Sequence, residues 1–256
     1  MPATASGDGQ AVGSEVSFAD EVGAVFADAA TTCDMSLCAI LRGTSDGAAS
    51  GIDQFVDLGC GFPTPKIGTV HRAAKLINSA ARTFSVDHNP RAVAETLLLT
   101  VTDPNAVVVE FDITRVEELI ERLTSPSQPV RLDPDRPMVV ILGLVVHLMD
   151  DRTTTRVLKE LYSWMPTGSR MVLTTPTSDT KGRVRDEMRA LVHLYRERIG
   201  VTWYLREVTK FLECLPVAAE PVQPWELHPE WEPHADLTDA DRLRLYNANV
   251  AVQLVT

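Results

Sequence analysis

The stretch VDLGCGFPTP, Val56 to Pro65, decides the fold of this chain. It continues a short apolar run and then places two glycines one residue apart, which is typical of a buried parallel strand that turns into a helix. Gly59 and Gly61 let the backbone approach a ligand closely and adopt positive φ angles. Pro63 and Pro65 stand where such turns usually carry a third glycine and the start of a helix. The stretch therefore predicts the glycine-rich turn of a doubly wound fold, with an unusual second half.

Strand-like and helix-like segments alternate through most of the chain. The expected strands are Gln54–Leu58, Thr83–Val86, Ala106–Phe111, Met138–Val146, Arg170–Thr175, Val217–Val222 and Asn247–Val255. The expected helices are Lys66–Arg82, Arg91–Thr100, Val116–Leu123, Asp151–Trp164, Lys181–Glu197 and Leu205–Leu212. This order predicts an α/β fold with a Rossmann-like, doubly wound sheet of about seven strands. The sheet is expected to be mostly parallel, with an antiparallel C-terminal edge.

The composition is that of a globular protein. The 256 residues are 45% hydrophobic and 23% charged, which suits one sizeable α/β domain. We expect a flexible polar leader at 1–14 and an N-terminal helical cap at 15–50. The Rossmann-like catalytic domain is expected at 51–256, with a helical insertion at about 177–212.

Charge and cysteine content exclude several classes of partner. A net charge of −11 argues against nucleic acid, which needs a basic surface. No apolar run approaches the ~20 residues that span a bilayer, and the first residues lack the pattern of a signal peptide. The cysteines, Cys33, Cys38, Cys60 and Cys214, fit no metal spacing. We therefore expect a cytoplasmic protein with reduced thiols and with no metal, nucleic-acid or membrane partner.

Acidic residues follow the second and third expected strands. Asp87 lies more than 20 residues after the glycine turn, where a carboxylate can accept both hydroxyl hydrogens of a ribose. Asp112, after the third strand, can accept a hydrogen bond from an adenine amino group. Ligands of doubly wound sheets bind at the carboxyl ends of the strands. This order of glycine turn, acid and acid is compatible with any cofactor that contains adenosine.

The two prolines of the turn narrow the choice of cofactor. A pyrophosphate needs successive free backbone N–H groups at a helix N-terminus, and Pro63 and Pro65 remove two of them. S-adenosylmethionine (SAM) has no phosphate, so it loses little by their absence. A nicotinamide-dependent oxidoreductase is a weaker alternative for the same reason.

These segments resemble motifs of a known family. FVDLGCG, VDHNP and VEFDI look like motifs I, II and III of class I SAM-dependent methyltransferases. QFVDLGCGFPT, FSVDHNP, VVVEFDI, VVHLMDD and the late Trp225 are more narrowly similar to an actinobacterial S-adenosyl methyltransferase family with a G-x-G-x-P-T loop. The resemblance covers about residues 51–256. It departs at the N-terminus, where the tyrosines and glycines usual in the family are missing.

The resemblance implies a SAM site along the expected sheet edge, with S-adenosylhomocysteine as product. It assigns the methionine end to the glycine loop, the ribose to Asp87, the adenine to Asp112 with Ile113, and the SAM ammonium group to the carbonyls of Leu142 and Gly143. The implied cofactor residues are Asp57, Gly59, Cys60, Gly61, Pro63, Thr64, Asp87, His88, Asn89, Asp112, Ile113, Leu142 and Gly143.

Two histidines are candidates for catalysis. A base is needed only when the acceptor is poorly ionised. His147 follows the fourth strand and is the tentative general base, although it could equally be a histidine that only hydrogen-bonds backbone beside the cofactor. His193, on the later helix, is a weaker candidate because histidines on helix surfaces are common.

The sequence thus predicts a SAM-dependent methyltransferase that modifies oxygen or nitrogen of a small molecule, with a natural product of secondary metabolism as the expected acceptor. The divergent N-terminus keeps an alternative open, in which a methyltransferase-like protein binds SAM and catalyses a non-methylating reaction such as a cyclisation. A homodimer is also left open.

Overall fold

The computed structural model describes residues 18–63, 69–127, 130–222 and 249–256. Several predicted features lie outside the described residues. They are Thr64, residues 66–68 at the expected start of a helix, and the segment around Trp225. Within the described ranges, no single helix is long and apolar enough to cross a membrane. The bent pair Phe18–Val25 and Ala29–Ala49 meets that length and composition only when its two helices are taken together, and many residues of the second helix are buried inside the protein.

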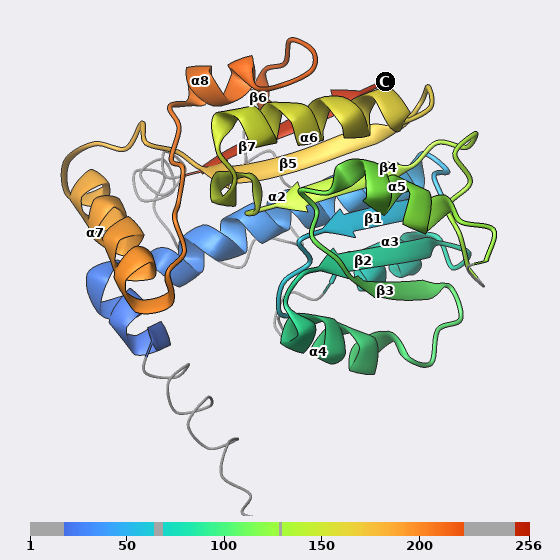
Figure 1. Cartoon of the computed structure of the whole chain (residues 1–256), viewed down its shortest axis with the longest axis horizontal. Helices are drawn as coiled ribbons and strands as arrows, with labels where there is room; N and C mark the ends of the chain where they lie inside the picture. Colours follow the sequence, from blue (N-terminus) through green and yellow to red (C-terminus); the bar gives the residue numbers. More distant parts are fainter. Residues whose placement is uncertain (1–17, 64–68, 128–129, 223–248) are drawn as a thin grey trace, which may run out of the picture.

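The core of the fold is a mostly parallel sheet with an antiparallel edge (Figure 1). Its strands, in the spatial order β3-β2-β1-β4-β5-β7-β6, include six of five or more residues and the two-residue β6. Their bounds are β1 Gln54–Leu58, β2 Arg82–Asp87, β3 Ala106–Glu110, β4 Val139–Gly143, β5 Arg170–Pro176, β6 Pro221–Val222 and β7 Asn249–Val255. Strands β1 to β5 pair in parallel, while β7 runs antiparallel to both β5 and β6. The predicted Rossmann-like fold with its antiparallel C-terminal edge is confirmed.

Helices cover both faces of the sheet. Alternate residues of the buried strands serve opposite faces, so Phe55 packs with the cluster beneath α2 and α3, whereas Val56 packs with the larger cluster beneath α5, α6 and α8. The helices are α2 Ala29–Ala49, α3 Val70–Ile77, α4 Pro90–Thr100, α5 Val116–Thr124, α6 Asp151–Trp164, α7 Gly182–Ile199 and α8 Val208–Glu213. Helix α6 has the predicted bounds, and the Asp150 carboxylate caps it by accepting a hydrogen bond from the Thr153 N–H at 2.7 Å.

Three expected elements are clearly shorter than predicted, among them the strand expected at Val217–Val222, of which only Pro221–Val222 forms. The strand expected to reach Val146 ends at Gly143, because Leu144 adopts a left-handed conformation with φ 51° and a short 3-10 turn, η1 Val146–Leu148, follows. The helix expected to reach Arg82 ends at Ile77, because Asn78 leaves the helical conformation and its side chain accepts a hydrogen bond from Ala80 N–H. Apolar content alone did not reveal these two breaks.

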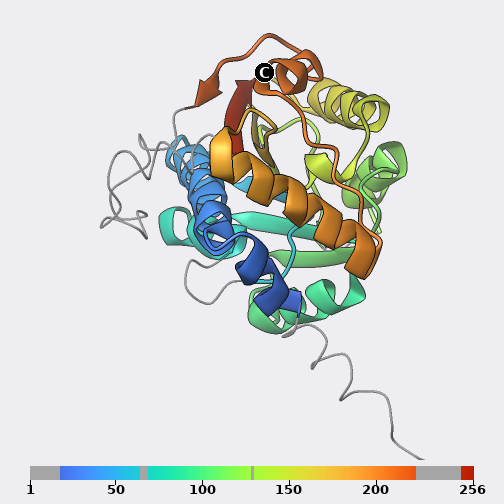
Figure 2. The ribbon, with the colours of Figure 1, turned by 90° about the vertical axis from the view of Figure 1, so that its left-hand side faces the viewer.

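The N-terminal helices and α7 pack together beyond the sheet. Phe26 is buried with three side chains of α7, namely Val184, Met188 and Leu191. Arg198 of α7 also donates two hydrogen bonds of 2.8 Å to the Glu21 carboxylate. Figure 2 shows α7 in front of the sheet, next to the helix Phe18–Val25. We call these packed helices, Phe18–Val25 together with α7, the cap.

Candidate active site

The glycine loop after β1 is tied to the end of β2 by one carboxylate. Asp87 accepts a hydrogen bond from Gly61 N–H at 2.9 Å with Oδ2 and from Asn89 N–H at 2.8 Å with Oδ1. Gly59 and Gly61 both have positive φ, 73° and 61°. A Cβ on Gly59 would lie 2.7 Å from a Val145 methyl group, so a larger residue does not fit there. The structure therefore brings the glycine loop and Asp87 together.

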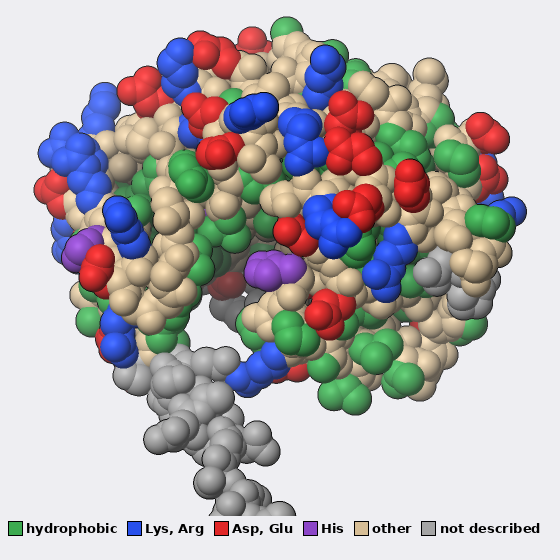
Figure 3. All heavy atoms as spheres, viewed as in Figure 1, with side chains coloured by type: hydrophobic (Ala, Val, Ile, Leu, Met, Phe, Trp, Pro, Cys, Tyr) green, Lys and Arg blue, Asp and Glu red, His purple; other side chains and the backbone are tan. Residues whose placement is uncertain are grey.

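A small cavity opens at the carboxyl ends of β1 and β4. It has a volume of about 90 Å³, and its lining includes Asp57, Gly59, Cys60, Pro63 and Gly143. That is below the ~300 Å³ of the smaller ligand pockets, so a ligand of ordinary size also extends into open space. Figure 3 shows a deep hollow between the cap and the sheet, with hydrophobic side chains on its walls.

Asp57 is the most unusual charged group in this cavity. Burial, with the nearby Asp87 carboxylate as a second cause, raises the pKa of Asp57 to about 7. In the described part of the chain, no side chain or backbone N–H donates a hydrogen bond to it. Burial also raises the pKa of the neighbouring Cys60 thiol to about 12, with the carboxylates of Asp57 and Asp87 as further causes. The thiol is therefore protonated and unreactive. The cavity thus offers a carboxylate that a bound cation would stabilise.

The end of β3 brings its acid to the same edge. Asp112 Oδ1 accepts hydrogen bonds of 2.8 Å from the N–H and the hydroxyl of Thr114, and Asp112 itself is exposed. Ile113 is buried beside it. His88 is exposed, whereas Asn89 caps α4 by accepting a hydrogen bond from Arg91 N–H at 3.0 Å.

The end of β4 is packed against α2. The side chain of Ile40 lies so close to Gly143 that a Cβ there would be 2.1 Å from the Ile40 Cδ1 atom. Leu142 is fully buried, and Leu144 N–H donates to Thr174 O at 2.9 Å. Sequence reasoning missed Ile40, which lines the cavity together with Leu37 of the same helix, because nothing in an apolar helix signals which residue touches a distant strand.

His147 follows β4 but is enclosed. Its side chain is 4% exposed, and its ring packs edge-on against Trp203 with centroids 4.6 Å apart. Burial, with the positive charge of Arg206 as a second cause, lowers the pKa of His147 to about 3. A general base works best with a pKa near the operating pH, so this environment disfavours His147 as a base; nor do the described residues give its Nδ1 the backbone hydrogen bond of the alternative. His193 is exposed on α7.

Arg206 is a buried residue that sequence reasoning did not identify. Its guanidinium donates hydrogen bonds to the carbonyls of Val146, Met149 and Tyr204, at 3.2, 2.6 and 3.2 Å. It also donates to the Asp151 carboxylate at 2.8 Å, and the segment is further joined to the turn by Tyr204 N–H, which donates to His147 O at 2.7 Å. Arg206 therefore fixes the turn after β4 to the segment that follows α7.

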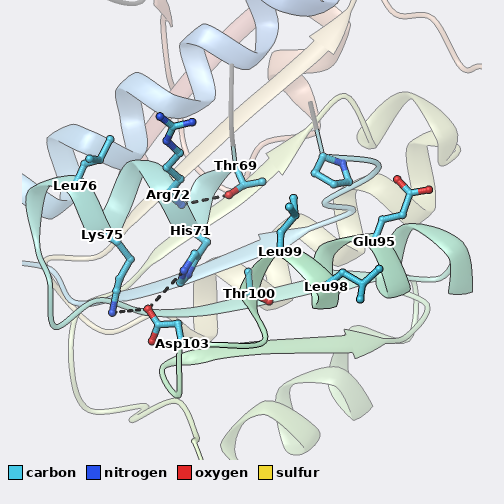
Figure 4. A pocket seen from close by; sticks show the side chains of 11 residues that line it. Thr69, His71, Arg72, Lys75, Leu76, Glu95, Leu98, Leu99, Thr100 and Asp103 are labelled. Atoms are coloured by element: carbon cyan, nitrogen blue, oxygen red, sulfur yellow. Dashed lines mark hydrogen bonds and ion pairs between the residues drawn. The ribbon is translucent and has the colours of Figure 1, made fainter. Parts of the chain in front are cut away.

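A larger hollow lies between α3 and α4 and shares Pro63 and Thr69 with the small cavity (Figure 4). It has a volume of about 780 Å³, and Leu76, Leu98 and Leu99 line it with much of their side chains exposed. Its Lys75 and Asp103 already form an ion pair at 2.8 Å. None of the acids that the sequence singles out lines this hollow, so we place the candidate site at the carboxyl ends of the strands.

Comparison with known proteins identifies the family of this chain. A family model described as S-adenosyl methyltransferase matches residues 12–253. The chain therefore belongs to the S-adenosyl methyltransferase family, and it is a SAM-dependent methyltransferase by class. The predicted enzyme class and cofactor are confirmed. The search of curated proteins gave no match.

Two solved structures share the fold. One, from Thermobifida fusca YX and described as a candidate methyltransferase, is 22% identical, has a TM-score of 0.76, and matches over 93% of this chain and 86% of its own. The other is a DUF574 family protein from Streptomyces avermitilis MA-4680, 20% identical with a TM-score of 0.77 over 94% of this chain and 89% of its own. At this identity the likeness extends to the fold alone.

Proposed function

We propose that this enzyme transfers the methyl group of SAM to oxygen or nitrogen of a small-molecule acceptor, and that it does so at the carboxyl ends of β1, β2 and β4. The observation that carries the proposal is the Asp57 carboxylate in a cavity beside the glycine loop, where none of the described residues donates a hydrogen bond to it. An ammonium or sulfonium cation is the natural partner of such a group. The family supports the cofactor, and the residues present fit it.

The residues of the glycine loop and of β2 and β3 would hold the cofactor. Asp87 is already oriented by two backbone N–H groups, and each carboxylate oxygen keeps a free lone pair for a ribose hydroxyl. Asp57 would meet the ammonium group, with the Gly143 carbonyl nearby, and Asp112 with Ile113 would border the adenine. Pro63 supports this choice over a phosphate-bearing cofactor because it has no N–H to donate. When bound, the cofactor supplies a methyl group on an already reactive sulfonium.

The chain's own contribution to the reaction is positioning. The hollow between the cap and the sheet would hold the acceptor next to the cavity, with the reacting atoms in line. It would also exclude water from them. A hollow bordered by helices suits a small molecule, and the net charge of −11 disfavours a nucleic acid. Because His147 is enclosed and neutral, we do not assign it the role of base.

A transfer assay tests this proposal. The enzyme is incubated with SAM that carries a labelled methyl group, together with a dialysable metabolite extract or, in parallel, with protein and RNA fractions. We expect label in dialysable products. Label confined to protein or RNA contradicts a small-molecule acceptor, and metabolite conversion without incorporation of label supports the non-methylating alternative instead.

A further inference from the structure

Four rings form a continuous row from the cap to the end of β4. Phe18 packs edge-on against Tyr195 with centroids 5.0 Å apart, and Tyr195 lies 4.6 Å from Trp203 at an angle of 50°. Trp203 in turn contacts His147, which follows β4. The row thus joins the cap to the turn after β4.

Two ring nitrogens in this row have no hydrogen-bond partner. His147 Nδ1 and Trp203 Nε1 are both buried and unpaired in the described part of the chain. Indole N–H is only a donor, whereas a neutral imidazole nitrogen donates or accepts according to its tautomer. Nearly all buried polar atoms of native proteins are paired, so two unpaired atoms in contacting rings require an explanation. Hydrogen-bond partners supplied by a ligand are one such explanation. The candidate cavity lies at the end of β4, the strand that His147 follows.

The charges around the row indicate what kind of ligand fits. Arg206 is the cation whose charge acts on His147. Its guanidinium already donates to five acceptors, so it has no free N–H for an anion. Asp57 and Asp87, at the sheet side, would repel a negative charge. An uncharged ring is therefore favoured over a carboxylate or a phosphate ester.

We propose that Trp203 recognises an uncharged aromatic ring in the methyl acceptor, with an oxygen substituent of that ring accepting a hydrogen bond from the indole N–H. The inference rests on the proposed function and names its substrate class. Trp203 is half-buried with Nε1 buried, and the proposal requires the indole to rotate on acceptor binding so that Nε1 reaches the hollow. Ring stacking and the new hydrogen bond would then offset the cost of that movement. Trp203 is in this view a specificity-determining residue.

The test measures binding of matched probes to enzyme saturated with S-adenosylhomocysteine. Phenol and 1-naphthol are compared with their saturated counterparts, cyclohexanol and 1-decalol. For at least one pair, we expect the aromatic member to bind about tenfold more tightly. Trp203→Leu should remove that preference, whereas Trp203→Phe keeps a ring and should weaken binding only about threefold, through loss of the N–H.

The control is Tyr162→Leu, which removes an aromatic side chain of α6 that donates its hydroxyl hydrogen to Val255 O, at the opposite end of the sheet. It should leave the preference unchanged. Equal binding of the aromatic and saturated members of both pairs, or an unaltered preference in Trp203→Leu, overturns the inference. Loss of S-adenosylhomocysteine affinity in Trp203→Leu also overturns it, because the role is then structural. Absence of S-adenosylhomocysteine binding to the wild type refutes the proposed function itself.

Discussion

The two halves of the sheet edge are built in different ways. In the half formed by β1, β2 and β3, the glycine loop and the strand ends are joined by contacts between successive segments of the chain, as when Asp87 accepts hydrogen bonds from Gly61, 26 residues earlier, and from Asn89, two residues later. In the half formed by β4, the turn after the strand is held by Arg206 and Trp203, more than 50 residues later in the chain. The first half would hold the cofactor and the second would face the acceptor. We therefore expect cofactor binding and acceptor binding to respond to different substitutions.

The largest effect is expected from Arg206→Leu. It removes the guanidinium hydrogen bonds to the buried carbonyls of Val146 and Met149, which keep only longer bonds such as those from the Thr154 hydroxyl at 3.4 and 3.2 Å, so the free energy of unfolding should fall by about 2–4 kcal/mol. Urea denaturation measures this loss. Arg156→Leu is the matched control, because Arg156 forms a half-exposed ion pair with Glu117 and should cost at most about 1 kcal/mol. Equal losses in the two variants would contradict the assigned role of Arg206.

Asp87→Ala should act mainly on the cofactor half. Loss of its hydrogen bonds should weaken the affinity for S-adenosylhomocysteine by about 1–3 kcal/mol, which is roughly 5- to 150-fold. Calorimetric titration measures the change, with Asp46→Asn as a control, since Asp46 pairs with Arg42 on α2. An affinity unchanged in Asp87→Ala would remove β2 from the proposed site.

The pH dependence of binding reports on Asp57. With its pKa raised to about 7, this carboxyl is mostly protonated at pH 6 and charged at pH 8. Because a bound ammonium group needs the charged form, the affinity for S-adenosylhomocysteine should rise about tenfold over this interval. Asp57→Asn should bind weakly at both values and lose that rise. A wild-type affinity that is flat from pH 6 to pH 8 would show that the ligand does not contact Asp57.

The stability of the free protein should depend on the ionisation of Asp57 with the opposite sign, decreasing with pH where the ligand affinity increases. A raised folded-state pKa means that between about pH 4 and pH 7 the folded state holds a proton that the unfolded chain has released. The contribution of Asp57 to stability should therefore decrease as the pH rises through that window. Urea denaturation of the wild type and of Asp57→Asn at about pH 4 and pH 7 isolates the contribution of Asp57 to the free energy of unfolding.

The smallest effect is expected from Leu98→Gln in the hollow between α3 and α4. Leu98 is 75% exposed, so the free energy of unfolding should change by less than about 0.5 kcal/mol. The affinity for S-adenosylhomocysteine should not change either. A marked loss of that affinity would mean that the cofactor half extends into this second hollow.

The arrangement of residues at the ends of β1, β2 and β3 could be predicted from the sequence because its signals are local. The apolar run before Gly59, the acid after β2 and the residues that cap α4 each lie within a few residues of the strand that they follow. Their placement at one edge then follows from the parallel topology. The pKa of Asp57 could not be foreseen, because it depends on burial and on a carboxylate 30 residues away.

The acceptor half was less accessible to sequence reasoning. His147 stood at the expected place, but its environment depends on Trp203 and Arg206, whose contacts cross the chain. The break at Leu144 was also hidden, because a leucine rarely adopts a positive φ and the run around it is apolar throughout. Tertiary contacts set the geometry there, and no local pattern encodes them.

Calorimetric titration of the wild-type enzyme with S-adenosylhomocysteine at pH 8, with NAD in a parallel titration, tests the central claim most directly. We predict saturable binding of S-adenosylhomocysteine at tens of micromolar or below, and no binding of NAD. Absence of S-adenosylhomocysteine binding in that range, or binding of NAD instead, would contradict the assignment of the carboxyl edge as a SAM site.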